Sequence, residues 1–268
     1  MLNLNKEELR KLQLIELELL KEFDRICRKH NIRYTLTGGT LLGAVRHGGF
    51  IPWDDDADVA MLRSEYNKFR EVCKVELKDK YYFQDMKTTP GYRWGYGKLR
   101  KRDTIFLREN QEHMPYEQGV FMDIFPRDAV PDKWLTRKLH KFECFCTRKI
   151  LWSSVGKIAD KRWYMNKWFA LVEKIVGDRV YKIYDSLVEK SSDTSTKLVR
   201  NLTFPVPNNR DGYERSGYEE SIELEFEGCK FLVNSNYEKW LEQEFGDYME
   251  LPPEEKRKVH PVVQLKLE

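Results

Sequence analysis

The residues best suited to chemistry lie between Gly38 and Asp58, in the stretch G-G-T-L-L-G-A-V-R-H-G-G-F-I-P-W-D-D-D-A-D. Two adjacent glycines ahead of a helix let backbone N–H groups approach an anion closely. Four aspartates then follow within five residues. In an extended segment Asp54, Asp56 and Asp58 project from one face, and their combined charge favours a hard divalent cation. This pattern predicts a site for a metal ion beside a phosphorylated substrate.

Two other interpretations of the aspartates are less favoured. Alternating aspartates often belong to a solvated loop. A calcium-binding EF-hand loop would use Asp54, Asp56, Asp58 and Glu65 at its positions 1, 3, 5 and 12. Its position 6 would be Val59, where the loop needs glycine for its turn, and a β-branched residue resists that backbone.

One more carboxylate, Asp123, lies inside the apolar run V-F-M-D-I-F at residues 120–125, which predicts a buried strand. A lone acid among apolar neighbours carries a large desolvation cost unless it meets a cation. A metal ligand is therefore favoured over a carboxylate that only accepts backbone hydrogen bonds.

The run L-T-G-G-T-L-L-G-A-V-R-H-G-G-F-I-P-W-D-D-D-A-D-V resembles the signature of the LicD family, which includes fukutin and the fukutin-related proteins. More broadly, it resembles the nucleotidyltransferase pattern of a glycine pair, a helix and an acid-x-acid strand. The match is nearly continuous over residues 34–63, and residues 246–260 resemble the end of LicD-family sequences. The resemblance implies an α+β fold, with a nucleotidyltransferase-like mixed sheet as its core.

The bacterial LicD branch implies transfer of phosphocholine from CDP-choline to a sugar hydroxyl of a cell-surface glycan precursor. We expect a teichoic acid or lipopolysaccharide acceptor, release of CMP, and Mg²⁺ or Mn²⁺ as the cation. Asp56 and Asp58 match the acid-x-acid pair of the family and Asp123 its third carboxylate, so these three are the predicted catalytic and metal-binding residues. Asp54 is a further predicted metal ligand, and Asp123 is the predicted acceptor of the hydroxyl proton. Asp55 faces the other way and is expected to hydrogen-bond the loop.

The predicted substrate contacts surround these acids. The glycine pair and the next hydroxyl are expected to hold phosphate, with an arginine fork nearby. Lys98 and Arg100 share a strand face, match a K-x-R segment of the family and would neutralise the leaving CMP; an exposed cross-strand ion pair is the alternative. His260 is either an acceptor-side group or a surface residue. The full predicted set is Gly38, Gly39, Thr40, Arg46, Trp94, Tyr96, Lys98, Arg100 and His260.

Aromatic side chains suggest where a quaternary ammonium group would bind, because it is recognised by aromatic faces rather than by hydrogen bonds. Tyr92, Trp94 and Tyr96 alternate just before Lys98, and Trp53 is a further candidate. Packing within the core is the alternative for each of these residues.

Hydrophobic periodicity predicts the elements that position these residues. Helices are expected over residues 5–30, 40–47, 64–77 and 235–245 and within 132–188, with Asn5, Ser64 and Ser235 as caps. Strands are expected over 32–37, 54–61, 81–88, 94–102, 104–107, 120–125, 197–204 and 222–233. We divide the chain into a catalytic core (residues 1–130), a helical subdomain (131–195) and a C-terminal part (196–268) that returns to the core.

Composition narrows the class of protein. Forty-seven basic against 44 acidic residues is too even a balance to indicate nucleic acid as a partner. The five cysteines form no C-x-x-C pattern, which predicts free thiols in a reducing compartment. No apolar run reaches membrane-spanning length, and the first thirty residues lack the apolar core of a signal peptide, so we expect a cytoplasmic protein.

Residues 133–182 contain 13 Lys or Arg and four Asp or Glu, interleaved with aromatic side chains. This composition suits an anionic lipid surface or a polyanionic glycan, and it predicts a lipid-linked acceptor reached at the inner face of the plasma membrane. Solvated faces of ordinary helices are the alternative.

Three other activities remain open at this point. The first is transfer of ribitol phosphate or another phospho-alcohol from its CDP adduct. The second is nucleotidyl transfer, and the third is a non-catalytic module that binds calcium or glycan.

Overall fold

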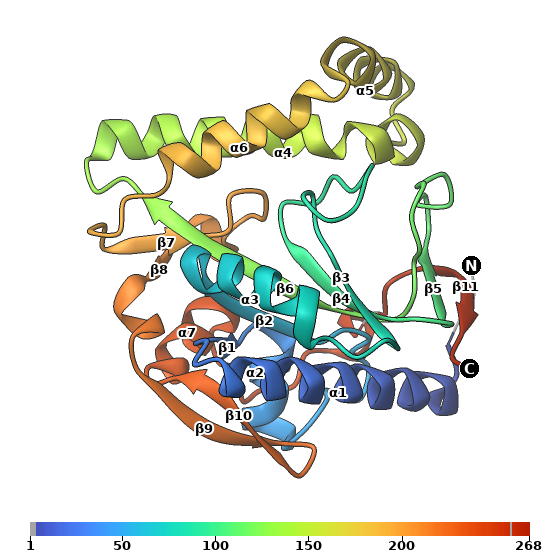
Figure 1. The fold of residues 1–268 in the computed structure, drawn as a ribbon, viewed down its shortest axis with the longest axis vertical. Coiled ribbons are helices and arrows are strands. Elements are labelled where there is room, and N and C mark those ends of the chain that lie inside the picture. Colours follow the sequence, from blue (N-terminus) through green and yellow to red (C-terminus); the bar gives the residue numbers. More distant parts are fainter. Residues whose placement is uncertain (1–3, 258) are drawn as a thin grey trace.

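The computed structural model describes residues 4–257 and 259–268. Its first element, α1 (Lys6–Lys29), carries the predicted capping box: the Asn5 side chain accepts hydrogen bonds from the backbone N–H groups of Glu7 and Glu8, and Glu8 bonds back to the Asn5 N–H. The apolar residues at helical spacing form a fully buried face that includes Leu12, Leu19 and Phe23. In Figure 1, α1 runs along the lower side of the molecule.

The core is a seven-stranded mixed sheet, as predicted. Its main path runs β1 (Thr35–Leu36), β2 (Asp58–Leu62), β6 (Phe121–Val130), β4 (Gly97–Lys101) and β3 (Tyr81–Gln84). The end of β6 pairs with β7 (Leu198–Arg200), which pairs with β8 (Tyr213–Glu214). β2 and β6 are parallel, and the other pairs are antiparallel. All ten residues of β6 are buried, so this strand is the centre of the fold.

Two helices flank β2. The first, α2 (Gly38–His47), begins at the glycine pair, and α3 (Arg63–Glu76) follows β2 directly. The predicted strand over residues 54–61 is wrong in its first half, because residues 54–57 form a loop and regular structure begins at Asp58. A turn at Pro52 and Trp53, closed by the Asp54 N–H donating to the Ile51 carbonyl, precedes this loop.

Four other strands form two-stranded sheets. β5 (Ile105–Arg108) pairs with β11 (Val262–Lys266), and β9 (Ser221–Phe226) pairs with β10 (Cys229–Asn234). The strand expected over residues 104–107 is β5, and it does not continue the main sheet, because a turn at Asp103, with φ at 62°, sends it toward the C-terminal segment. Short 3₁₀ turns occupy Pro207–Asn209, Arg215–Tyr218 and Glu254–Lys256.

The last helix, α7 (Tyr237–Phe245), ends at Gly246, whose φ of 71° suits glycine. The predicted caps Ser64 and Ser235 are wrong. β2 runs directly into α3, so that Leu62 is its N-cap, and α7 begins after Asn236; no side chain caps either helix. All five cysteines are free, as expected.

The long helices predicted within residues 132–188 are α4 (Trp134–Ala159), α5 (Trp163–Val176) and α6 (Arg179–Lys190). Figure 1 shows α4 and α6 above the sheet, with α5 beyond them. This layer contacts the loop before β4: the Tyr184 hydroxyl donates to the Gly95 carbonyl (2.9 Å), and Arg93 donates to the Ile150 carbonyl (3.2 Å). The three-part division of the chain stays an interpretation.

A buried ion pair joins three elements of this architecture. The Arg63 guanidinium at the start of α3 donates to both carboxylate oxygens of Asp128 on β6, at 2.7 and 2.6 Å, and to the hydroxyl of Tyr184 on α6. The Asp128 carboxylate is fully buried. Because removing one partner leaves a charge buried without compensation, this pair is costly to break.

We predict that Asp128→Ala lowers the free energy of unfolding by about 3–5 kcal/mol, the range typical of a broken buried pair. Urea denaturation followed by circular dichroism measures this loss. The matched control is Glu71→Ala, which breaks an exposed pair with Lys74 and is expected to leave the transition midpoint nearly unchanged. Equal effects of the two substitutions would contradict the assigned role of Asp128.

Candidate active site

Three charged side chains share one row of the sheet. Asp58 on β2 pairs in register with Asp123 on the parallel strand β6, and Asp123 pairs in register with Lys98 on β4. Neighbouring strands lie about 4.8 Å apart, so the two carboxylates leave the sheet side by side. Two adjacent β-segments thus bring the predicted catalytic acids together.

Lys98 neutralises Asp123. Its ammonium group donates to the Asp123 carboxylate and lies 3.3 Å from the centroid of the Phe121 ring. Both members of the pair are buried, so the alternative of an exposed ion pair is wrong. Burial lowers the pKa of Lys98 to about 7, against the opposing effect of the Asp123 charge. Lys98 is therefore poised to exchange its proton near neutral pH.

The glycine pair brings the N-terminus of α2 against the acids. Gly38 has a φ of +56°, and a Cβ atom there would lie 3.4 Å from a carboxylate oxygen of Asp58. A Cβ atom on Gly39 would lie 2.4 Å from a carboxylate oxygen of Asp54. Among the described residues no side chain caps this helix, and the approach of Gly38 and Gly39 to Asp58 and Asp54 puts the positive end of the helix dipole beside the acidic loop. The Thr40 hydroxyl accepts the Asp58 N–H (2.8 Å) and so fixes the start of β2.

The aspartates carry more negative charge than the side chains around them neutralise. Burial, followed by repulsion from Asp56 and Asp55, raises the pKa of Asp54 to about 8. Burial also raises the pKa of Asp56, and it raises that of Asp58 well above its usual range, with Asp56 and Asp123 adding to the effect. One carboxylate oxygen of Asp58 is buried without a hydrogen-bond partner among the described residues. A cluster of oxygen donors with an unsatisfied acceptor fits a hard divalent cation.

Arg108 is a basic residue of the site that the sequence analysis missed. From the end of β5 its guanidinium lies 3.4 Å from an Asp56 oxygen and 3.3 Å from Nδ1 of His260. Asp55 accepts hydrogen bonds from the backbone N–H (3.2 Å) and Nδ1 (2.9 Å) of His260. Asp55 therefore bonds the C-terminal segment rather than its own loop, which differs from the expected role. No pattern near Arg108 in the sequence predicts this role, because the pairing of β5 with the distant strand β11 brings the residue to the site.

A second set of ligand atoms overlaps the predicted one. Asp55, Asp56 and His260 each offer one atom, and these atoms lie within 4.8 Å of one another. An imidazole among them suits transition metals better than Mg²⁺, whereas the aspartates alone supply only oxygen. The assignment of the metal to Asp54, Asp56, Asp58 and Asp123 stays a prediction.

Helix α1 contacts the backbone of the acidic loop through hydrogen bonds. Gln13 donates to the carbonyls of Asp54 (2.9 Å) and Ile51 (3.3 Å). Glu16 is fully buried, neither of its carboxylate oxygens has a partner among the described residues, and burial raises its pKa well above the usual range. Glu16 follows Leu12 by four residues on the apolar face of α1, and a charged residue at such a position was a signal available in the sequence.

The predicted aromatic residues gather beside Lys98 and Asp123. They precede β4 in a loop rather than in the expected strand. Tyr96 stacks on Phe125 with ring centroids 4.8 Å apart, and the indole of Trp94 donates to the hydroxyl of Tyr116 (3.2 Å). Tyr92 is fully buried, and its hydroxyl has no partner among the described residues. Because the Lys98 ammonium lies 5.4 Å from the Tyr96 centroid, this cluster already holds a cation against aromatic faces.

Two predicted phosphate ligands contact backbone carbonyls instead. Arg100 is buried and donates to the Gln84 side chain (2.8 Å) and the Gly119 carbonyl (2.6 Å). Arg46 donates to the carbonyls of Tyr248 (2.8 Å) and Glu250 (3.1 Å). Both arginines therefore stabilise the fold through hydrogen bonds within the protein. Their contact with substrate stays a prediction.

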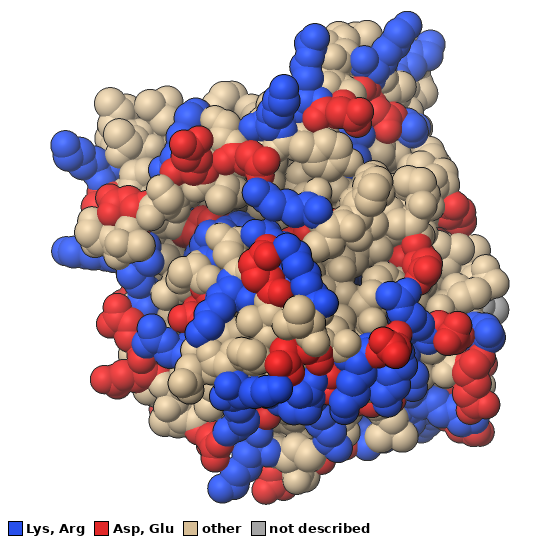
Figure 2. Space-filling model, viewed as in Figure 1, with Lys and Arg blue, Asp and Glu red and all other residues tan. Residues whose placement is uncertain are grey.

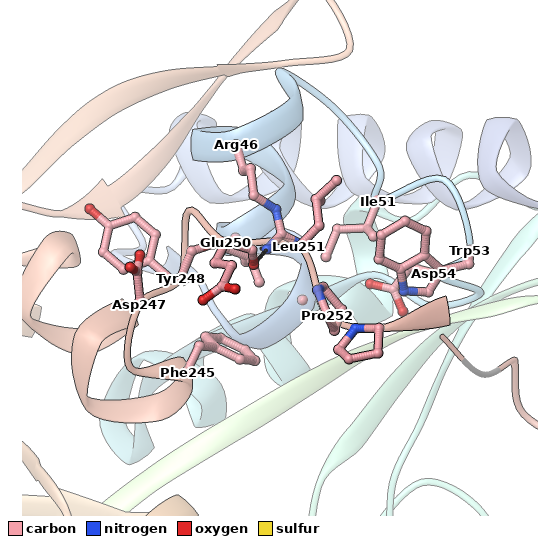
Figure 3. A pocket seen from close by; sticks show the side chains of 13 residues that line it. Arg46, Ile51, Trp53, Asp54, Phe245, Asp247, Tyr248, Glu250, Leu251 and Pro252 are labelled. Atoms are coloured by element: carbon pink, nitrogen blue, oxygen red, sulfur yellow. Dashed lines mark hydrogen bonds between the residues drawn. The ribbon is translucent and has the colours of Figure 1, made fainter. Parts of the chain in front are cut away.

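A pocket of about 460 Å³ opens beside Gly39 and Asp54. In Figure 3, Trp53 and Asp54 lie at one end of the pocket and Phe245, Asp247 and Tyr248 at the other. The Trp53 ring also carries the guanidinium of Arg257 at 4.6 Å. The volume of the pocket suits a small ligand such as a sugar unit.

Carboxylates on two parallel strands of a mixed sheet, beside the start of a glycine-initiated helix, are typical of a nucleotidyltransferase-like enzyme. The comparisons with known proteins agree. Residues 31–151 match the family described as LicD/FKTN/FKRP, nucleotidyltransferase domain. The chain belongs to the LicD family and is a transferase.

The similarity to individual relatives differs in extent. The chain is 32% identical to the lipopolysaccharide cholinephosphotransferase LicD of Haemophilus influenzae over 274 residues, which cover 97% of this chain and 98% of the relative. It is 60% identical to the human ribitol 5-phosphate transferase FKRP over 45 residues, 17% of this chain and 9% of that protein. An uncharacterised Rickettsia prowazekii protein, RP689, is 29% identical to this chain over 116 residues, which cover 43% of this chain and 40% of that protein.

We predict that the metal-free protein loses stability as pH rises from about 4 to 8. The pKa of Asp54 is about 8 in the folded protein and near its ordinary value of 3.8 in the unfolded chain, so the folded state binds more protons across this range. Because a tenfold change in proton affinity corresponds to about 1.4 kcal/mol, the loss attributable to Asp54 should be at least that large.

Urea denaturation with a chelator at several pH values tests this prediction. Asp54→Asn removes the titrating group and should flatten the decline, and Mg²⁺ should flatten it for the unmodified protein by favouring the carboxylates. An identical pH dependence in the two proteins would contradict the prediction.

Proposed function

We propose that this enzyme transfers phosphocholine from CDP-choline to a sugar hydroxyl of a cell-surface glycan precursor and releases CMP. The observation that carries the proposal is the register of Asp58 and Asp123 beside the uncapped start of α2. The near full-length similarity to a lipopolysaccharide cholinephosphotransferase supports choline as the transferred alcohol. A lipopolysaccharide or teichoic acid precursor is the proposed acceptor.

The chemistry asks mainly for positioning and charge neutralisation. The sugar oxygen attacks the choline-bearing phosphorus, the bond from that phosphorus to the bridging oxygen breaks, and CMP leaves with the bond's electrons. Asp123 accepts the hydroxyl proton once Lys98 has turned toward the departing phosphate. The first N–H groups of α2, from Gly38 to Thr40, hold the diphosphate oxygens. Asp54, Asp56, Asp58 and Asp123 would hold Mg²⁺ or Mn²⁺, which would neutralise charge on the reacting phosphates.

The aromatic cluster before β4 is the proposed choline site. The rings of Trp94 and Tyr96 lie 6.4 Å apart, and Tyr96 is close enough to Asp123 to be affected by its charge, so a trimethylammonium group bound here would meet ring faces and a carboxylate. The Lys98 ammonium, which lies against the rings of Phe121 and Tyr96, supports this proposal, because it is itself a monovalent cation beside aromatic faces.

The pocket beside Asp54 is the proposed acceptor site. Asp247, Glu250 and Arg46 line it and offer hydrogen-bond partners to the hydroxyls of a sugar, while Gly39 and Asp54 connect it to the proposed diphosphate and metal site. We infer that this acceptor is linked to a membrane lipid and that the reaction takes place at the inner face of the plasma membrane.

Transfer of ribitol phosphate from CDP-ribitol is the second candidate, because the 45 residues shared with FKRP are 60% identical. That similarity covers a small part of both chains, whereas the similarity to the cholinephosphotransferase covers nearly all of each. Turnover of CDP-choline against CDP-ribitol by the same preparation separates the two.

We predict that Asp123→Asn lowers kcat for transfer from CDP-choline by at least about a thousandfold. The substitution keeps the shape of the side chain but removes the charge that would accept the proton and help hold the metal. CMP release measures the rate. Asp103→Asn is the matched control, because Asp103 is exposed and its left-handed backbone also suits asparagine.

Retention of the wild-type rate by Asp123→Asn would exclude this mechanism. It would favour a non-catalytic module that binds calcium or glycan. Production of pyrophosphate, or transfer of CMP to the acceptor, would point to nucleotidyl transfer instead.

We also predict that Trp94→Leu raises KM for CDP-choline by about 5–30-fold, the equivalent of 1–2 kcal/mol of cation–π binding. It should leave the KM of an active analogue with a neutral tert-butyl group nearly unchanged. Steady-state kinetics with both donors measure the difference. Equal effects on the two donors would mean that Trp94 packs the loop rather than contacts the ammonium group.

A further inference from the structure

Helix α5 turns an apolar face outward. Tyr164, Trp168, Leu171 and Ile175 recur at spacings of four, three and four residues, which places them on one side of the helix, and all four are exposed. Ile175 is 62% exposed, and the neighbouring Trp163 is 70% exposed. Phe169 is the one fully buried residue of α5, and it packs against Trp152 of α4 at 5.1 Å. An ordinary surface helix shows the opposite distribution.

Basic side chains border this face. Lys161, Lys167 and Lys174 are exposed and form no ion pair among the described residues. The Lys167 ammonium lies 5.0 Å from the Trp163 ring centroid. Tryptophan and tyrosine next to lysine are the side chains that settle at the boundary between lipid headgroups and acyl chains.

Helix α4 presents a second stripe of the same character. Leu135, Leu139, Phe142 and Phe145 are exposed at spacings of four, three and three residues, and the Lys138 ammonium lies 4.3 Å from the ring of Trp134. Figure 1 shows α4 and α5 on the side of the molecule opposite α1, and Figure 2 shows Lys and Arg around uncharged surface at that side. Within the described residues, no helix has the length and apolarity to cross a bilayer.

We propose that the exposed face of α5, with its bordering lysines, is a docking surface for anionic phospholipid headgroups and lies in the plane of the membrane interface. A second copy of this chain is a poorer occupant, because a symmetric contact would bring the lysines of both copies together. An anionic membrane instead neutralises the lysines and covers the aromatic side chains. The surface lies on the same helical layer that contacts the loop of Trp94 and Tyr96.

Docking deepens the proposed function by naming how the enzyme reaches a lipid-linked acceptor, yet the binding can be measured without any turnover. The probe is a set of large unilamellar vesicles made of phosphatidylcholine alone or with 30% phosphatidylglycerol. We expect the full chain to sediment with the anionic vesicles and not with the neutral ones. Each bordering lysine contributes about fivefold to partitioning.

The triple variant Lys161→Gln, Lys167→Gln, Lys174→Gln should therefore bind anionic vesicles about a hundredfold more weakly. The double variant Leu171→Gln, Ile175→Gln should weaken binding by at least about tenfold, since it removes two apolar anchors. Lys6→Gln, Lys11→Gln, Lys21→Gln on α1 is the matched control for charge and should bind like the unmodified protein. Circular dichroism confirms that each variant is folded.

Equal binding to neutral and anionic vesicles, or unchanged binding by the triple variant, would overturn the proposal. Dimerisation in light scattering that the α5 double variant abolishes would also overturn it, because the face would then belong to a second copy. Turnover of a short soluble acceptor provides a separate readout. If both variants retain that turnover and lose vesicle binding, the surface serves the membrane; failure of all proteins to turn over CDP-choline would affect only the proposed function.

Discussion

The structure depends on parallel pairing of β2 with β6, which forces like charges together in a buried place. Asp58 and Asp123 are neighbours because the two strands are in register, and the loop before β2 adds three more aspartates. Burial, and then repulsion from neighbouring carboxylates, oppose ionisation of Asp54 and Asp58. A fold that buries these carboxylates must offset the free-energy cost with positive charge and hydrogen-bond donors nearby, and several groups around the sheet do so.

The compensation comes from widely separated parts of the chain. The start of α2 directs unpaired N–H groups at the loop, Lys98 neutralises Asp123, and Arg108 lies against Asp56. Helix α1 supports the loop backbone through Gln13, which donates to the Asp54 carbonyl. These groups offset only part of the negative charge of the aspartates. The remaining negative charge is what a site for a divalent cation requires.

Much of this arrangement could be predicted from local pattern. The capping box at Asn5, the glycine start of α2, the buried strand around Asp123 and the long basic helices all follow from residue types at fixed spacing. The limits of prediction are equally physical. Alternation of aspartates resembles a strand from residue 54, but a turn at Trp53 and bonds from α1 hold residues 54–57 as a loop.

Arg108 could not be identified because its place depends on the pairing of β5 with β11, about 150 residues apart, and no periodicity encodes such a contact. The same separation has a consequence for synthesis on the ribosome. The acidic loop and β5 emerge early, yet the strand that holds β5 and the imidazole bonded to Asp55 follow about 150–200 residues later, roughly 10–40 s at ordinary rates of elongation. During that interval the nascent chain carries the acidic loop without the contacts of β11 and His260, so the centre is completed only after β11 has been synthesised.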